Sequence, residues 1–413
     1  MPDARPRFEV ADVVRAHGEQ YRRLHAPSPL QAQVLTHIES CRTAALGGHL
    51  DECDGCGYVR ISYNSCRDRH CPKCQASARA EWLEQRLSRL LPVPYFHVVF
   101  TLPAELHALA LGNKRVVYDL LFAAASQTLL CLGRDGRHLG AQIGVTAVLH
   151  TWGQNLLLHP HLHCVVTGGG LSMDGKRWVA GRERYFLPVQ VLGRLFRGKF
   201  LHALQQAFNA GRLHLRGSTA DLADEASWDS LRDALYRKEW VVYAKPPFGG
   251  PEQVFRYLGR YTHRVAISNH RLVEVADGTV AFTLKDYADG GQRKTMTLQG
   301  VEFLRRFLLH VLPKGFVRIR HFGLCASANV RTKLARAQEI LASLSPDRPA
   351  PPLGTDTAAS WSDRFLQRTG IDVMTCPGCG ERLIRRETVL PARSRAQAIP
   401  NACPRAPPRA AVA

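Results

Sequence analysis

The pattern of apolar and polar positions predicts strands and helices mixed along the chain. Short runs rich in β-branched and aromatic residues, ended by Pro or Gly, are typical of strands. One such run ends at Pro103, and another ends in the triplet Gly168-Gly169-Gly170. On this basis we expect strands near 95–102, 142–151, 161–167, 264–275, 279–285 and 293–298.

Helical periodicity fills most of the remaining segments. Two helices are expected in residues 7–45, and the second begins at Ser28-Pro29, where Ser caps and Pro occupies the first helical position. Further helices are expected near 76–91, 104–132, 190–211, 227–238, 252–262, 301–312 and 327–344.

Composition shifts indicate the domain boundaries. Residues 346–360 are rich in Pro, and from Thr388 onward no acidic residue occurs while Pro, Ala and Arg dominate. We therefore expect a helical and cysteine-containing module at 1–91 and a main domain at 92–345. A linker at 346–370, a small cysteine-containing knob at 371–387 and a disordered basic tail at 388–413 would follow.

The charge balance indicates a polyanionic partner. The 413 residues include 55 Lys plus Arg against 35 Asp plus Glu, a formal net charge of +20. Nucleic acid is the usual partner of so basic a chain. The start lacks the apolar segment of a signal peptide, and the apolar stretch 116–132 is interrupted by Asp119 and by 126–128. We therefore predict a cytoplasmic protein in which that stretch is a core helix.

Cysteine spacing predicts zinc. The motifs Cys53-x-x-Cys56 and Cys71-x-x-Cys74 are separated by fourteen residues, in a segment with too few apolar residues to form a core. Two such turns can close a tetrahedron around a zinc ion, which would also explain how the segment folds. The same segment also carries Cys41, His49, Cys66 and His70, which are candidates for a second, interleaved zinc site, and the pairing of ligands between the two sites is open.

A third pair, Cys376-x-x-Cys379, lies far along the chain in the predicted knob. It has no evident second pair nearby. A half-site, a site shared in a dimer and a vestige are all compatible with the sequence.

Histidines form the next candidate site. On a strand, His161 and His163 would point to the same face, so that both rings could bind one cation while Leu162 packs into the core. Two imidazoles leave the coordination sphere incomplete. Gln154 on the preceding segment is the expected third ligand, and His150 is the alternative.

Two tyrosines four residues apart complete the chemistry. On a helix, Tyr257 and Tyr261 would share one face. They are surrounded by cations, which suits a site for scissile phosphates better than a core: Arg256, Arg260, His263 and Arg264. A phenol is a weak nucleophile at neutral pH and gains from a metal that polarises the phosphate. The tyrosine pair and an imidazole-held metal therefore make chemical sense together.

These motifs in this order resemble the HUH endonuclease superfamily, named for His–hydrophobic–His, and within it the two-tyrosine transposases of rolling-circle bacterial insertion sequences. The resemblance rests on the blocks at 66–74, 97–103, 150–155, 159–170 and 257–261 and covers most of the chain. It implies an α+β fold in which an antiparallel sheet flanked by helices carries the histidines on a central strand, with the tyrosines on a facing helix.

The resemblance also implies an activity. Catalytic Mg²⁺ or Mn²⁺ would be held by His161, His163 and a third polar ligand, for which Gln154 has the right spacing. Structural Zn²⁺ would fold the N-terminal module. One tyrosine would cut single-stranded DNA at the element's end to give a 5′-phosphotyrosine, and the second would allow a further strand transfer. Such a protein would act in the bacterial cytoplasm at the nucleoid.

Two alternatives remain. A replication initiator or relaxase would use the same chemistry, although the sequence contains no helicase P-loop. A zinc-containing DNA-binding regulator without catalysis would have no need of the tyrosine helix. A zinc hydrolase is disfavoured, because residues 155–170 contain no Asp or Glu to act as a base.

Overall fold

The computed structural model describes residues 6–74, 82–83, 86–87, 89–181, 187–245, 259, 265–286, 289–344, 360–370 and 372–391. The chain divides into two compact units. The first comprises residues 1–39 and 68–357, and the second comprises residues 40–67 and 358–413. Helices and antiparallel sheets are mixed in the described residues, which confirms the predicted α+β class.

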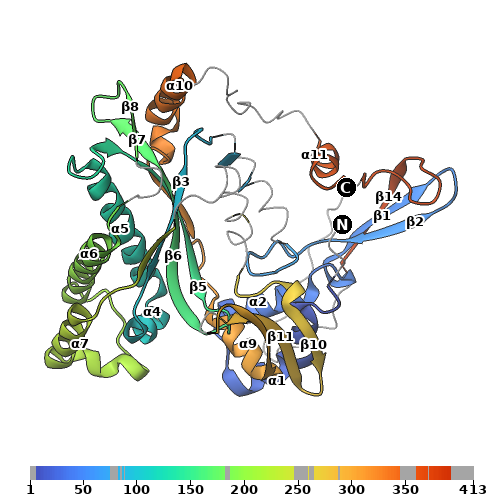
Figure 1. Cartoon of the computed structure of the whole chain (residues 1–413). Coiled ribbons are helices and arrows are strands. Elements are labelled where there is room, and N and C mark those ends of the chain that lie inside the picture. Colours follow the sequence, from blue (N-terminus) through green and yellow to red (C-terminus); the bar gives the residue numbers. More distant parts are fainter. Residues whose placement is uncertain are drawn as a thin grey trace, which may run out of the picture. The chain divides into compact units, whose positions relative to one another are not determined.

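A five-stranded antiparallel sheet organises the first unit (Figure 1). Its strand order is β13-β5-β6-β3-β9, and β6 is the central strand. The strands are β3 (Tyr95–Thr101), β5 (Gly144–Trp152), β6 (Leu158–Thr167), β9 (Val242–Lys245) and β13 (Ile319–Gly323). The three inner strands lie close to the predicted runs: β3 and β5 are almost continuously buried, and the first part of β6 alternates between buried and half-buried residues.

Helices cover one face of this sheet and bury its core. They are α4 (His107–Gly112), α5 (Lys114–Arg134), α6 (Val189–Asn209) and α7 (Glu225–Arg237). In Figure 1, α5, α6 and α7 lie to the left of β3, β5 and β6. The core joins apolar side chains from both layers, such as Phe100 of β3, which lies 4.9 Å between ring centroids from Phe196 of α6.

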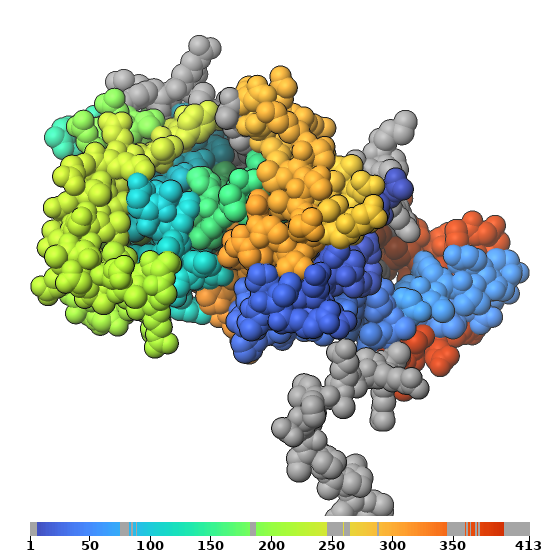
Figure 2. Space-filling view, turned by 90° about the horizontal axis from the view of Figure 1, so that it is seen from below, coloured from blue at the N-terminus to red at the C-terminus, as the bar shows by residue number. Residues whose placement is uncertain are grey.

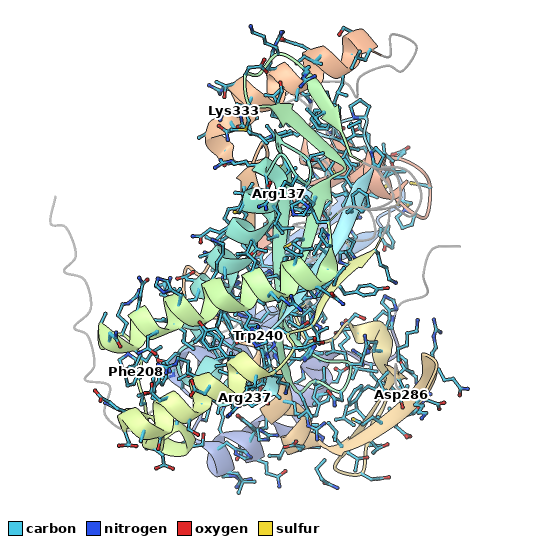
Figure 3. All side chains as sticks on the ribbon, turned by 60° about the vertical axis from the view of Figure 1, so that its left-hand side comes forward. Arg137, Phe208, Arg237, Trp240, Asp286 and Lys333 are labelled. Atoms are coloured by element: carbon cyan, nitrogen blue, oxygen red, sulfur yellow. The ribbon has the colours of Figure 1, made fainter. Side chains whose placement is uncertain are left out.

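Aromatic residues also fix the outer helices. Trp240 packs against Phe196 and Phe200 at centroid distances of 5.3 and 5.4 Å, and Phe208 stacks on Trp228 at 4.0 Å. Figure 3 shows Trp240 beside α6 and Phe208 toward the ends of α6 and α7. By length and composition, α5 could cross a membrane, but 67% of its most apolar window is buried, as is typical of a core helix.

Two smaller sheets extend the first unit. One has the order β4-β7-β8 and the other β10-β11-β12. Their strands are β4 (Ala141–Gln142), β7 (Gly169–Ser172), β8 (Trp178–Ala180), β10 (Leu272–Ala276), β11 (Thr279–Asp286) and β12 (Gln292–Gln299).

The remaining helices of this unit are α1 (Val10–His25), α2 (Pro29–Ser40, whose last residue falls in the second unit), α9 (Gly300–Leu309) and α10 (Ala335–Leu344). Short helical turns lie at Ala104–Leu106, Gly217–Ala223, Asn269–Arg271, Ser327–Asn329 and Val330–Leu334. Helix α1 packs on α9, and Figure 2 shows the N-terminal residues beside those near 300.

The second unit contains a three-stranded sheet of order β14-β1-β2. Its strands are β1 (Gly48–Cys53), β2 (Val59–Tyr63) and β14 (Leu383–Val389), and it also contains α11 (Trp361–Thr369) and the turn Ala44–Leu46.

The structure divides the chain differently from the sequence expectation of 1–91, 92–345, 346–370, 371–387 and 388–413. The first helices pack with the main unit, since α1 contacts α9. The knob is not separate, because β14 pairs with β1 and runs to Val389. Part of the predicted linker forms α11, which Ser360 caps by accepting from the backbone of Asp363. A composition shift cannot reveal such pairing between distant segments.

Candidate functional site

The central strand β6 places the predicted histidines on the face opposite the core. Leu162 and Cys164 are fully buried in the apolar core, whereas His161 and His163 are half-buried on the other face. This is the arrangement that the alternation of a strand predicts. The strand starts at Leu158 and runs through Pro160, so His159 lies on the same face and is exposed.

A third histidine joins them from the neighbouring strand. His150 of β5 lies directly opposite His161 in the antiparallel register. Ligating nitrogens of His150, His161 and His163 all lie within 4.8 Å of one another. The His150 ring is also close to that of His163, at a centroid distance of 4.3 Å. Three imidazoles on one face of a sheet form a candidate metal centre.

Hydrogen bonds prepare two of these rings for coordination. The Nδ1 atom of His161 lies 2.6 Å from the carbonyl oxygen of His159. A carbonyl only accepts, so this nitrogen donates, and the Nε2 atom of the neutral ring keeps its lone pair. The Nδ1 atom of His163 lies 2.8 Å from Nε2 of His97 on β3. Such outer partners set the tautomer and orientation of metal-ligating histidines.

The electrostatic environment keeps these imidazoles neutral. Burial lowers the pKa of His161 to about 4, although the bond to the His159 carbonyl opposes the shift. Burial, followed by the charges of neighbouring histidines, lowers the pKa of His163 well below its ordinary value. Burial and Lys245 lower the pKa of His97 to about 4. A metal ligand must be unprotonated, so His161 and His163 are in the required form at neutral pH.

Gln154, the third ligand expected from spacing, lies in the turn between β5 and β6. Its backbone carbonyl accepts a hydrogen bond from Arg271 at 2.6 Å. Arg306 donates to the next carbonyl, that of Asn155, at 3.1 Å. His310 lies 2.9 Å from the Leu156 carbonyl oxygen and 3.0 Å from Thr151 Oγ1. Side chains of Arg271, Arg306 and His310 therefore hold the turn that joins β5 and β6 through its backbone carbonyls. The residue that the sheet places next to His161 is His150.

The predicted tyrosine helix lies outside the described residues. This applies to Tyr257 and Tyr261 and to the surrounding Arg256, Arg260, His263 and Arg264.

In the second unit the cysteines are grouped differently from the prediction. Cys53 and Cys56 lie with Cys376 and Cys379, and the four sulfurs are within 4.8 Å of one another. The sequence expectation had instead placed Cys53 and Cys56 with Cys71 and Cys74. The C-terminal pair is therefore neither a half-site nor isolated.

Of the other four predicted cysteine ligands, Cys41 and Cys66 belong to the second unit and Cys71 and Cys74 to the first. In the second unit, the backbone amide of Cys66 lies 3.5 Å from Cys41 Sγ. In the first unit, Cys71 and Cys74 share one tight turn, in which the Cys74 amide donates to the Cys71 carbonyl at 3.1 Å.

The two predicted histidine ligands have other surroundings. Both ring nitrogens of His70 are engaged, Nδ1 with Asp68 at 2.9 Å and Nε2 with the amide of Leu312 at 3.3 Å. His49 lies within β1, opposite Thr388 and Ser62. Neither histidine belongs to a group of ligating atoms among the residues that the structure describes.

Comparison with known proteins identifies the family. Residues 144–333 match the family model Y2_Tnp, described as "Putative transposase", and residues 13–102 match Zn_Tnp_IS91, described as "Transposase zinc-binding domain". The "Putative transposase y4qJ" of Sinorhizobium fredii (strain NBRC 101917 / NGR234) is 53% identical over 377 residues, covering 91% of this chain and 94% of the relative. The chain belongs to the transposases of IS91-like elements.

A more distant relative agrees. The "Transposase for insertion sequence element IS801" of Pseudomonas savastanoi pv. phaseolicola is 28% identical over 366 residues, covering 86% of this chain and 83% of the relative. No solved structure matches the chain. The matched segment 144–333 contains all three histidines of the candidate metal centre. The zinc-binding domain and the cysteine clusters support structural Zn²⁺ in this transposase.

Sequence reasoning missed two features of these sites. His97 was part of a family block but was not assigned to the site, because its distance from His163 depends on the register between β3 and β6. The partnership of Cys376 and Cys379 with Cys53 and Cys56 was also missed. The shared pattern Cys-x-Gly-Cys-Gly at both positions is the signal that could have revealed it.

Proposed function

We propose that this transposase nicks and rejoins single-stranded DNA through 5′-phosphotyrosine intermediates at a metal centre formed by His150, His161 and His163. The observation that supports it best is the convergence of three imidazoles on the face of the central sheet opposite the core, where burial keeps His161 and His163 neutral. A transposase must break and join phosphodiester bonds, and a divalent cation is the usual means of neutralising the charge that develops on the phosphate.

The donor set fits Mn²⁺ better than Mg²⁺. Magnesium prefers oxygen ligands, whereas imidazole nitrogen suits transition metals. We therefore propose Mn²⁺ as the better cofactor, with His150 in place of Gln154 as the third protein ligand. When bound, the cation would polarise the scissile phosphate and stabilise the leaving oxygen. His97 would hold His163 in position, and the turn containing Gln154 would fix the spacing between β5 and β6.

Tyr257 and Tyr261 are the proposed nucleophiles. As a bond forms between the tyrosine Oη and phosphorus, the bond from phosphorus to the 3′ oxygen breaks. The phenol proton is released and the 3′ oxygen gains a proton, so no water or external energy source is consumed. The phosphotyrosine preserves the bond energy until a free 3′-OH attacks it in the reverse sense.

The charge of the chain supports binding of the substrate. The net charge of +20 favours association with a polyanion, and part of it lies beside the tyrosines, in Arg256, Arg260 and Arg264, with His263 next to them. These residues are proposed to contact the phosphates that flank the cleaved bond. The N-terminal zinc-binding domain, with its own arginines, would add affinity for DNA.

Cleavage of a labelled single-stranded oligonucleotide that carries the element's end tests the proposal. With Mn²⁺ present, we expect a covalent protein–DNA adduct that survives denaturation. The double variant Tyr257→Phe/Tyr261→Phe should form none. Tyr236→Phe is the matched control, because Tyr236 is an exposed tyrosine of α7, and it should retain full adduct formation.

An undiminished adduct in the double variant would contradict the nucleophile assignment. Adduct formation that is unaffected when all divalent metal is chelated would contradict the metal centre. Equal adduct yields on duplex and single-stranded DNA would remove the proposed preference for single strands.

A further inference from the structure

Two turns at opposite ends of the chain share the pattern Cys-x-Gly-Cys-Gly and the same backbone hydrogen bonds. They are Cys53-Asp-Gly-Cys56-Gly57 and Cys376-Pro-Gly-Cys379-Gly380. In the first, the amide of Gly57 donates to the Cys53 carbonyl at 2.9 Å. In the second, the amide of Gly380 donates to the Cys376 carbonyl at 3.0 Å.

The match extends to the next residue. The amide of Cys53 donates to the Tyr58 carbonyl at 2.9 Å, and the amide of Cys376 donates to the Glu381 carbonyl at 2.7 Å. Gly57 and Gly380 both adopt left-handed backbone angles, with φ of 71° and 82°. Only glycine adopts this conformation without cost, so each final glycine lets its chain turn back after the second cysteine. The result is two copies of one thiol-presenting turn.

The four sulfurs of these turns face one another. Cys53 Sγ lies 3.3 Å from Cys379 Sγ, and Cys56 Sγ lies 3.6 Å from Cys376 Sγ. Both distances are far longer than a disulfide bond of about 2.05 Å. A tetrahedral zinc ion with Zn–S bonds of about 2.3 Å needs its sulfurs about 3.8 Å apart. The spacing is therefore that of four thiolates around one cation.

The same segments pair into one sheet that aligns the two turns. Cys53 ends β1 directly opposite Leu383, the first residue of β14. Asp51 of β1 accepts from Arg60 of β2 at 3.0 Å and from Arg385 of β14 at 3.3 Å. Figure 2 shows residues near 50–63 in light blue beside the C-terminal residues in red. The C-terminal strand is thus part of the cysteine module.

We propose that Cys53, Cys56, Cys376 and Cys379 bind one structural zinc ion that joins the N-terminal zinc-binding domain to the C-terminal segment. A closed set of four thiolates leaves no open position for substrate, so the ion is structural. The family match for the zinc-binding domain ends at residue 102 and therefore includes only half of these ligands.

The apolar contacts at this place are too few to hold the segments together. Among the residues that the structure describes, the buried apolar cluster here consists of Cys53, Cys376 and Leu383. Joining Cys56 to Cys376, which are 320 positions apart, also costs the entropy of closing a very long loop. Binding of the metal supplies the free energy for such small modules. The second unit therefore folds only when both ends of the chain and zinc are present.

Zinc content and thiol protection in the full-length protein test this proposal. We expect Cys376→Ser/Cys379→Ser to lose about one zinc ion per chain, and Cys53→Ser/Cys56→Ser to lose the same one. Combining the four substitutions should remove no more than either pair does. Cys131→Ser is the matched control, because Cys131 is an exposed cysteine of α5, and its zinc content should equal that of the unsubstituted protein.

Alkylation of the unsubstituted protein under reducing conditions gives an answer independent of how the variants fold. Cys56 and Cys379 are exposed, so without a metal both should react as readily as Cys131. With zinc bound, both should be protected, and a chelator should expose all four thiols together. Reaction of Cys376 and Cys379 before chelation, or full zinc content in Cys376→Ser/Cys379→Ser, would overturn the proposal.

Discussion

The Nε2 atom of His97 lies 2.8 Å from the Nδ1 atom of His163, and the two rings stack 13° from parallel. One nitrogen donates and the other accepts, so His97 determines which nitrogen of His163 is available to a metal. His97 is 6% exposed and sits on β3, one strand away from the metal-facing pair. It is therefore a positioning residue for the proposed centre.

We predict that His97→Ala weakens Mn²⁺ binding by about 10–100-fold, the usual effect of losing an outer-shell partner. His97→Gln should recover part of the affinity, because its amide can still bond His163. Isothermal titration with Mn²⁺ measures both. His202→Ala removes an exposed histidine of α6 and should leave the affinity unchanged. If His97→Ala and the unsubstituted protein bind Mn²⁺ with equal affinity, His97 has only a packing role and does not position His163.

The third ligand can be identified by comparing His150→Ala with Gln154→Ala. His150 lies directly opposite His161, whereas Gln154 lies in the turn beyond the strand. We expect His150→Ala to reduce Mn²⁺ affinity at least tenfold, or about 1.4 kcal/mol, and Gln154→Ala to change it little. Electron paramagnetic resonance of bound Mn²⁺ would also show the loss of one nitrogen ligand. The reverse ranking of the two variants would restore Gln154 as the ligand.

The stability that Glu302 contributes should depend on pH. Glu302 binds Arg306, which in turn donates to the Asn155 carbonyl in the turn before β6. This carboxylate of α9 accepts from Arg305 at 2.5 Å and from Arg306 at 2.7 Å. The hydrogen bond from Arg305, opposed by partial burial and helped by Arg306, lowers the pKa of Glu302 to about 2. Because the folded pKa is below the unfolded value of about 4.3, its contribution to stability is fully present above that value. It is lost as the pH falls through about 2.

Glu302→Gln should therefore lower the free energy of unfolding at neutral pH, and the difference from the unsubstituted protein should shrink between about pH 4 and pH 2. Urea denaturation across this range measures it. Glu339→Gln breaks an exposed pair with Arg336 in α10 and should have little effect at any pH. A difference between Glu302→Gln and the unsubstituted protein that does not change with pH would contradict the role of this carboxylate.

Gly323, at the end of β13, should not tolerate a side chain. Its φ is +60°, and a Cβ there would overlap the carbonyl oxygen of Ile143. That oxygen accepts from the amide of Leu324 at 3.0 Å, so the backbone cannot move away freely. We expect Gly323→Ala to cost more than about 1 kcal/mol and to lower Tm by several degrees in a thermal melt.

Gly175→Ala is the matched control for Gly323→Ala. Gly175 has a similar φ of +72°, but nothing lies within 4 Å of an added Cβ. The control therefore reports the backbone strain without the overlap, and its loss of Tm should be clearly smaller. Equal losses would show that the close approach to Ile143 has no consequence.

Local patterns in the sequence were sufficient for the three inner strands of the sheet, whereas its two edge strands, β9 and β13, were not predicted. The alternation in residues 161–167 predicted both a strand and a common face for His161 and His163, because strand geometry is set within the strand itself. The apolar run 116–132 was likewise predicted as a core helix, and α5 is mostly buried. The transposase family was also evident from the order of the motifs.

Partners from distant segments were not predictable in this way. His97 and His150 reach His163 and His161 only through the registers of β3 and β5 against β6, and a shift of one residue would turn each ring to the other face. The expected set Cys53, Cys56, Cys71 and Cys74 followed closeness along the chain.

The sequence by itself determined which side chains have donor atoms for a metal and which strand presents His161 and His163. Only the tertiary structure decided the membership of each site. It placed His150 beside the histidine pair, and it brought Cys376 and Cys379 to Cys53 and Cys56. The physical reason is that donor chemistry belongs to single residues, whereas coordination needs several donors within a few ångströms, a condition set by strand pairing across the whole chain.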